Sequence, residues 1–316
     1  MSFNDNAQLD TSQVESGGGG GGRGGFPGGT RVGGGIGGLI LLIIMLIFGG
    51  QSILGGGDGT DTGTNGLPDQ SLQPDQVSGA GQVPDSAFTQ CKTGADANRN
   101  DVCLVIATVN SVQDYWSKTL PKYNTNYEPA KTVIYSGTTP SACGTASSQV
   151  GPFYCPLDGK VYIDASFFQE LKSRFGANGG QLAKEYVVAH EYGHHIQDLL
   201  RILDRAQQDP QGPQSGAVRI ELMADCLAGT WVKHATETTD AQGNTLLKPI
   251  TKDDITSALS AAAAVGDDRI QQKTQGRVTP ESWTHGSAEA RQRWFLQGYE
   301  TGDLNQCNTF GVQNVT

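Results

Sequence analysis

Apolar residues recur every three or four positions through much of the chain, a spacing that predicts amphipathic helices. The first such helix follows the polar pair Asn100 and Asp101, which is typical of a helix start. Its apolar face consists of Val102, Ile106, Val109, Val112 and Trp116. The same spacing predicts further helices near residues 181–201, 216–236, 252–272 and 287–299.

Two short runs of β-branched and aromatic residues predict strands, because each is bounded by Gly, Pro or Asp. They are TVIY at 132–135 and KVYI at 160–163. A few strands followed by a series of helices predicts an α+β domain, mostly helical with a small sheet. We place this domain at residues 87–316.

The first part of the chain has a different composition. Residues 1–35 are polar and then rich in glycine, which predicts a disordered tail. The next segment is almost wholly apolar as far as Phe48, and no charge occurs between Arg31 and Asp58, so we predict a transmembrane helix at 36–54. Residues 55–86 are mostly Gly, Pro, Asp and Gln, the composition of a flexible linker.

The charges on either side of the apolar segment predict its orientation. Arg23 and Arg31 precede it and Asp58 follows it, and positive charge favours the cytoplasmic side. A cleaved signal peptide is the alternative, but such a peptide begins with a short basic region, and here residues 1–35 come first. We therefore expect a single-pass membrane protein with a cytoplasmic N-terminus and an extracytoplasmic domain.

The net charge is -10 and the isoelectric point is near 4.9. Binding to a phosphate backbone requires clustered Lys and Arg side chains, and the sequence contains no such cluster. Nucleic acid is therefore not an expected partner.

The cysteines give independent information about the compartment. All six follow the apolar segment, and an even number is typical of an oxidising environment. They are Cys91, Cys103, Cys143, Cys155, Cys226 and Cys307. Six cysteines allow 15 connectivities, of which loop closure favours Cys91 with Cys103, Cys143 with Cys155, and Cys226 with Cys307. Six reduced, buried thiols in a cytosolic protein are the alternative.

The predicted helix at 181–201 contains an H-E-x-x-H motif at residues 190–194. Two histidines four residues apart lie on one helix face, so His190 and His194 can both direct an imidazole toward one zinc ion. Glu191 is rotated about 100° around the axis and can reach a metal-activated water as its general base. This arrangement predicts peptide-bond hydrolysis, and a surface histidine pair on an ordinary helix is the alternative.

A catalytic zinc site needs a third protein ligand. A metzincin would supply a histidine six residues after His194, but that position is Leu200, which excludes this class. A gluzincin supplies a glutamate from a following helix, with an aspartate one turn later that orients a ligand histidine. Glu221 and Asp225 have this spacing, although two acidic residues on a solvated helix face are the alternative reading.

Several segments resemble those of the putative neutral zinc metallopeptidase family, between about Cys91 and Tyr299. They include GPFYCPLDGKVYID, AHEYGHHIQ, ELMADCLAG and GRVTPESWTHGSAEARQRWFLQGY. The resemblance implies that His190, His194 and Glu221 bind Zn²⁺ and that Glu191 is catalytic. It also implies a gluzincin-like domain behind a single membrane span in the bacterial cell membrane.

Two further features are candidates for a role in catalysis. His285, in the segment THGS, could stabilise an oxyanion, although such a histidine is more often a packed loop residue. The strand around Val161 could bind a peptide substrate as an added edge strand. We expect His195 to face away from the metal.

Two functions remain open from the sequence. The first is a zinc-dependent endopeptidase that acts on protein or peptide substrates near the membrane. The second is a catalytically silent, zinc-stabilised binding module tethered to the same membrane. The glutamate at position 191 favours the enzyme, because a silent module does not need a general base.

Overall fold

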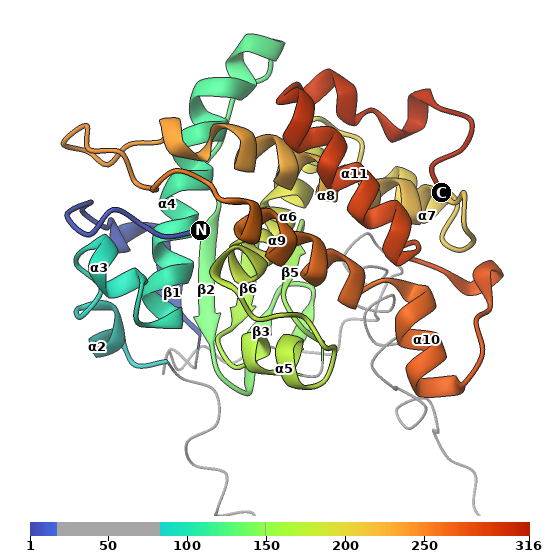
Figure 1. The fold of residues 1–316 in the computed structure, drawn as a ribbon, viewed down its shortest axis with the longest axis horizontal. Helices are drawn as coiled ribbons and strands as arrows, with labels where there is room; N and C mark the ends of the chain where they lie inside the picture. Colours follow the sequence, from blue (N-terminus) through green and yellow to red (C-terminus); the bar gives the residue numbers. More distant parts are fainter. Residues whose placement is uncertain (18–82, 149) are drawn as a thin grey trace, which may run out of the picture.

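The computed structural model describes residues 1–17, 83–148 and 150–316 as a mixed α+β fold in which helices predominate (Figure 1). The strands are β1 (Val14–Ser16), β2 (Lys131–Tyr135), β3 (Thr138–Ser141), β4 (Gly144–Ser147), β5 (Phe153–Cys155) and β6 (Lys160–Asp164). The α-helices are α2 (Asp85–Phe88), α3 (Gly94–Ala97), α4 (Asp101–Thr119), α5 (Phe167–Ser173), α6 (Gln181–Leu199), α7 (Arg205–Gln208), α8 (Gly216–His234), α9 (Lys252–Ala264), α10 (Asp267–Gln275) and α11 (Ala288–Thr301). The predicted α+β class, mostly helical with a small sheet, is confirmed.

The main sheet has four strands in the order β1-β2-β6-β5. Strands β1, β2 and β6 run parallel, and β5 runs antiparallel to β6, with Tyr154 opposite Val161. Strands β3 and β4 form a separate antiparallel pair. Val161 therefore lies on an interior strand, so the prediction that its strand receives a substrate peptide at an edge is wrong. The edge on that side is β5.

Helix α6 is the central element of the fold. It contacts β5 and β6 of the sheet, and it also packs against α4, α8 and α9. Helix α8 packs in turn along α11, and the large buried side chains Tyr186, Trp231 and Phe295 fill the space among these helices. The residues of α6 that carry the H-E-x-x-H motif are therefore held on several sides by packed elements.

Local sequence explains where the main helices begin. The side chain of Asn100 accepts hydrogen bonds from the first backbone N–H groups of α4, as predicted. Ser215 and Ser287 cap α8 and α11 in the same way. The helix predicted over 252–272 is instead two helices, α9 and α10, because Gly266 is extended and a side chain there would collide with the backbone of Ala288.

The N-terminal residues differ most from the prediction. Residues 1–17 are packed on the domain, with Met1, Phe3 and Ala7 fully buried and β1 joined to the main sheet. The prediction of a disordered tail over 1–35 is thus wrong for residues 1–17. A few buried apolar side chains and specific hydrogen bonds hold this segment, although its sequence has no continuous apolar pattern. In Figure 1 this segment, in blue, lies beside α3 and α4.

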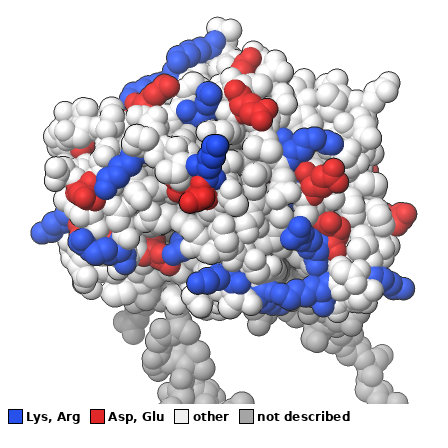
Figure 2. Space-filling view, viewed as in Figure 1, with Lys and Arg blue, Asp and Glu red and all other residues white. Residues whose placement is uncertain are grey.

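The predicted transmembrane helix at 36–54 and nearly all of the predicted linker at 55–86 lie outside the described residues. Within residues 1–17 and 83–316, no helix combines the length and the apolar character needed to cross a bilayer. The face of the molecule drawn in Figure 2 carries lysine, arginine and acidic side chains interspersed over most of its area.

Three disulfides join the six cysteines in the pairing that loop closure favoured. They are Cys91–Cys103, Cys143–Cys155 and Cys226–Cys307. The third fixes the C-terminal segment to α8, and its partners are 81 positions apart in the sequence. The predicted connectivity is confirmed.

Candidate metal centre

Helices α6 and α8 approach each other closely at the H-E-x-x-H motif. The residue at the second variable position is Gly193, and a Cβ atom there would lie only 3.0 Å from the Cα of Ala224 on α8. A larger residue would push the two helices apart, since the contacted atom belongs to the backbone. The motif therefore includes the residue that allows α8 to come within reach of the two histidines.

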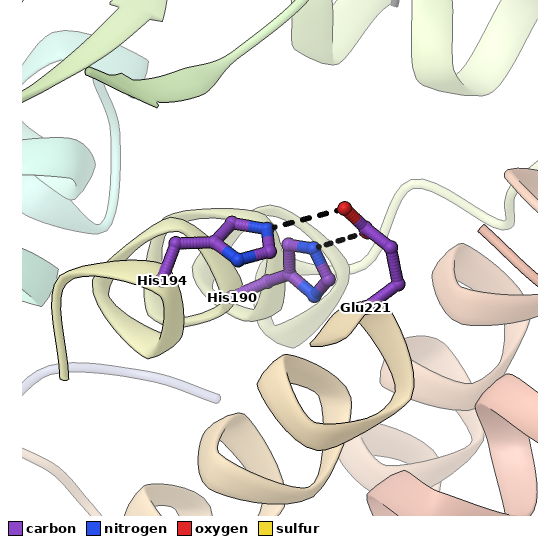
Figure 3. A group of neighbouring side chains, drawn as sticks. All are labelled: His190, His194 and Glu221. Atoms are coloured by element: carbon purple, nitrogen blue, oxygen red, sulfur yellow. Dashed lines mark hydrogen bonds and ion pairs between the residues drawn. The ribbon is translucent and has the colours of Figure 1, made fainter. Parts of the chain in front are cut away.

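This crossing brings together three side chains that can bind a metal. The Nε2 atom of His190 lies 3.2 Å from one carboxylate oxygen of Glu221, and Nε2 of His194 lies 3.5 Å from the other. The three potential ligand atoms all lie within 4.8 Å of one another. Figure 3 shows both imidazoles projecting from α6 toward the carboxylate on α8.

The geometry fits a zinc ion. Zinc takes imidazole nitrogens and carboxylate oxygens at about 2.0 to 2.2 Å in tetrahedral sites, which places neighbouring ligand atoms about 3.3 to 3.5 Å apart. Each imidazole lies near this distance from one of the two Glu221 oxygens, and a single oxygen lies within 4.8 Å of both rings. Two imidazoles and one carboxylate also leave the fourth position for water or substrate, as in catalytic zinc sites.

The second nitrogen of each imidazole is fixed by a different partner. Nδ1 of His190 lies 2.9 Å from Asp225, the carboxylate predicted to orient it. Nδ1 of His194 lies 2.9 Å from the side-chain oxygen of Gln197, whose amide donates to the carbonyl of Ile220. These contacts leave both Nε2 atoms directed at Glu221, which is the orientation that metal binding requires.

Asp225 is fully buried and is held by a cation. Arg291 of α11 donates to both of its oxygens, at 2.9 and 3.0 Å, and also to the hydroxyl of Tyr186. Burial would raise the pKa of Asp225, but Arg291 and His190 more than offset this and hold it below its usual value. The carboxylate that faces His190 therefore remains ionised.

In the metal-free protein the pKa values of the two imidazoles are shifted in opposite directions. Burial lowers the pKa of both rings, but Asp225 reverses the effect for His190 and raises its pKa to about 10. The Nδ1 atom of His194 faces a neutral amide, so burial lowers the pKa of this ring to about 4 although Glu221 opposes the shift. Metal binding requires neutral imidazoles, so a metal ion would displace a proton from the His190 imidazole.

Glu191 lines the same cleft as these three side chains, with 7% of its surface exposed. Burial raises the pKa of its carboxyl group to about 7, although the charge of His190 opposes this shift. A carboxylate whose pKa lies near neutrality is well suited to accept and release a proton at neutral pH.

The cleft over the centre is mainly apolar. One wall is the segment from Val150 to Phe153, which leads into the edge strand β5. The other apolar lining comes from α6, α7, α8 and the turn before α7, and includes Val187, Leu203, Ala206, Ala217 and Ile220. The centre therefore opens onto a site that can receive an apolar group.

His285 also lines this cleft. Its Nδ1 atom lies 2.8 Å from the hydroxyl of Thr284, and the Glu221 carboxylate and Asp267 raise its pKa although burial opposes this. Asp267 accepts the backbone N–H groups of residues 284, 285 and 286, which fixes the loop that carries His285. The structure thus brings the predicted His285 into the same site.

His195, Tyr154 and Tyr162 lie outside the candidate metal centre. His195 faces away from the centre, as expected, and contacts Tyr154 and the carbonyl of Glu128. The hydroxyl of Tyr154 donates to Asp198, and that of Tyr162 donates to Asp158. These side chains are structural.

Sequence reasoning missed the groups that orient the centre from behind. Gln197 lies three residues after His194 on one helix, a spacing that could have revealed it. Arg291 follows His190 by 101 positions, and no local pattern connects the two. Asp267 precedes the loop that it holds by 17 to 19 positions, so no local spacing connects it to His285.

The fold and the site define a mixed α+β protein in which two histidines and one carboxylate are arranged so that they could hold a metal ion. This chain belongs to the family described as "putative neutral zinc metallopeptidase", whose model matches residues 4–310.

Its relatives include an uncharacterized protein of Mycobacterium tuberculosis, 53% identical over 234 residues, which cover 74% of this chain and 78% of the relative. The uncharacterized protein YpfJ of Escherichia coli K12 is 44% identical over 213 residues, 66% of this chain and 70% of the relative. No solved structure matches the chain significantly.

Proposed function

We propose that this protein is a zinc-dependent endopeptidase. The observation that carries the proposal is the convergence of His190, His194 and Glu221 at zinc-ligand spacing, with Glu191 beside them in an apolar cleft. The family description supports the same class of reaction.

His190, His194 and Glu221 would hold the zinc ion. When bound, zinc lowers the pKa of a coordinated water and polarises a carbonyl group. Asp225 and Gln197 fix the ring orientations, and Arg291 keeps Asp225 ionised. The metal would therefore enter a centre that is already arranged to receive it.

Glu191 is the proposed general base. Its carboxylate would take the proton of the attacking water and deliver it to the leaving amine, so one side chain would serve both steps. A pKa near 7 in the metal-free protein supports this role, because the group then exchanges protons readily in either direction.

His285 is the proposed donor to the developing oxyanion. It lines the cleft, and Asp267 and Thr284 hold its Nδ1 side, which leaves Nε2 for the substrate. Replacing His285 with Ala should lower kcat about 100-fold at nearly constant KM. An unchanged kcat would remove it from the mechanism.

The peptide substrate would lie along β5. This strand is the sheet edge beside the centre, and residues 150–153 line the cleft. An added strand forms main-chain hydrogen bonds, which gives affinity with little sequence preference. A substrate whose backbone amides are N-methylated next to the cleaved bond should then be cut poorly, and equal kcat/KM for both peptides would contradict this placement.

The apolar walls of the cleft suggest which side chain the enzyme prefers. Val187, Leu203 and Ile220 surround space next to the ligand Glu221. Burial of a substrate side chain there would favour apolar residues by about 25 cal/mol per Å² of apolar surface. We therefore expect cleavage next to a medium-sized apolar residue.

An extracytoplasmic location for the domain is supported by the disulfides. Three of them close loops within one domain, and such bonds persist in oxidising compartments. Protein and peptide substrates outside the cytoplasm are accordingly the proposed targets.

The test compares metal content with turnover of the full-length protein. We expect one zinc per chain, hydrolysis of casein or a mixed peptide library, loss of hydrolysis after chelation and recovery when zinc is restored. A protein that binds no zinc would contradict the proposal. Bound zinc without cleavage of any peptide would favour the silent binding module.

A further inference from the structure

The two ends of the segment 18–82 meet at one place on the domain. Gly17 is the last residue of the described N-terminal segment, and its backbone N–H donates to the carbonyl of Ile134 at 2.8 Å. Val83, where the chain is described again, accepts a hydrogen bond from the hydroxyl of Ser16. The chain therefore departs from and rejoins the domain at the same edge of the main sheet.

Residues 1–17 occupy a site that is built to receive them. Asn98 accepts the backbone N–H of Phe3 and donates to its carbonyl, both at 2.9 Å. Asn110 does the same for Asp10, at 2.8 and 2.9 Å. Each asparagine side chain thus satisfies both the backbone N–H and the carbonyl group of one residue, as pairing with a neighbouring strand would.

Apolar and ionic contacts strengthen this attachment. Phe3 is fully buried in the main core, and β1 adds to the sheet beside β2. Glu15 of β1 forms an ion pair with Lys160 at 2.6 Å. The family model begins at residue 4, so it includes residues 4–17 of this segment.

We infer that residues 1–17 and the domain lie on the same side of the membrane. A segment whose two ends are bound at one place on one domain cannot cross a bilayer an odd number of times. Residues 32–57 carry no charge and are long enough for one helical crossing of roughly 20 residues, but too short for two.

This inference replaces the single crossing suggested by the flanking charges. It does not depend on peptidase activity, because it rests on the docking of residues 1–17 alone. Together with the disulfides, it places the N-terminus outside the cytoplasm with the domain.

Single added cysteines test the inference directly. Asn6→Cys reports on the N-terminal segment and Lys122→Cys on the domain, since both positions are exposed and the six native cysteines are in disulfides. Each full-length variant is treated in spheroplasts with a membrane-impermeant maleimide, before and after permeabilisation. We expect the two cysteines to react under the same condition. Reaction of Lys122→Cys before permeabilisation and of Asn6→Cys only afterwards would overturn the inference.

Hydrogen exchange tests the docking itself in the purified full-length protein. The amides of Phe3 and Asp10 should exchange at least tenfold more slowly than in the Asn98→Leu, Asn110→Leu double variant, with the amides of α6 unaffected. Fast exchange at both amides of the unmodified protein would contradict the docking, whether or not the double variant folds.

Discussion

His190 and His194 differ in what holds the second nitrogen of each ring. A neutral amide, from Gln197, suffices for His194, whereas His190 faces a buried carboxylate that needs its own cation. Arg291 is that cation, and it is 3% exposed. His190 is therefore the candidate ligand whose ring orientation depends most on a residue distant in the sequence.

Replacing Arg291 with Met should weaken zinc binding by 10- to 100-fold, because Asp225 would lose its charge partner and His190 its fixed orientation. Competition with a chelator of known affinity measures the effect. Arg293→Met is the matched control, since Arg293 lies on the same helix but is exposed. Equal zinc affinity in both variants would show that Arg291 does not act on the centre.

Glu185, on α6 before the motif, is buried without a hydrogen bond to its carboxylate among the described residues. The Met1 ammonium lies 3.3 Å away, but burial dominates and raises the pKa from 4.5 to about 7. The folded protein then retains a proton that the unfolded chain releases, so this group's contribution is present below pH 4.5 and is lost as the pH rises through 7.

Glu185→Gln should therefore match the unmodified protein at pH 4.5 and exceed its free energy of unfolding at pH 8 by up to about 3 kcal/mol. Urea unfolding at the two pH values measures this difference. Glu237→Gln, at an exposed position, serves as the control. A Gln variant that is less stable at pH 8 would show that the ion pair with Met1 outweighs the cost of burial.

At the scale of elements, the centre depends on close helix contacts. Helix α8 carries Glu221 and Asp225, and α11 carries Arg291. The distance between these two helices therefore sets the position of Arg291 relative to the two carboxylates. Gly229 and Gly298 allow the contact, because a side chain at either would meet the backbone of the other helix.

Gly298→Ala tests this contact. Alanine normally stabilises a helix relative to glycine, but here its methyl group would collide with the carbonyl of Cys226. We expect a loss of roughly 3 kcal/mol in the free energy of unfolding, measured in urea. Gln297→Ala is the neighbouring control, and a Gly298→Ala protein as stable as this control would contradict the tight packing.

Elements with their own periodic pattern were predictable from sequence. The helix after Asn100 begins where its cap predicted, and β2 and β6 lie where β-branched runs occur. The break at Gly266 was not predictable, because its cause is the backbone of Ala288 on another helix. The docking of residues 1–17 has the same explanation, since it depends on Asn98 and Asn110.

The same division applies to the site. Spacing along one helix identified His190, Glu191 and His194, and a second helix supplied Glu221. Arg291 is joined to them only through folding. Local chemistry thus predicts the ligands, whereas the groups that orient them require the tertiary structure.

At the scale of the molecule, the disulfides differ in the length of chain they close. Cys226–Cys307 spans 81 positions, whereas Cys91–Cys103 spans 12. Loop-closure entropy grows with the logarithm of loop length, which favours the longer bridge by about 2 kcal/mol.

Cys226→Ala, Cys307→Ala should accordingly lower the Tm more than Cys91→Ala, Cys103→Ala. Thermal unfolding of the two double variants under identical conditions makes the comparison. A larger loss from the short bridge would show that local packing and not chain closure determines what these disulfides contribute.

Peptide cleavage is proposed to require both a zinc ion held by His190, His194 and Glu221 and the carboxylate of Glu191 as general base. The most direct measurement compares zinc content and peptide turnover of the unmodified protein, Glu191→Gln and the exposed control Glu289→Gln. We predict one zinc per chain in all three and a loss of turnover of at least about 100-fold in Glu191→Gln alone. Equal turnover in Glu191→Gln and the unmodified protein would contradict the account.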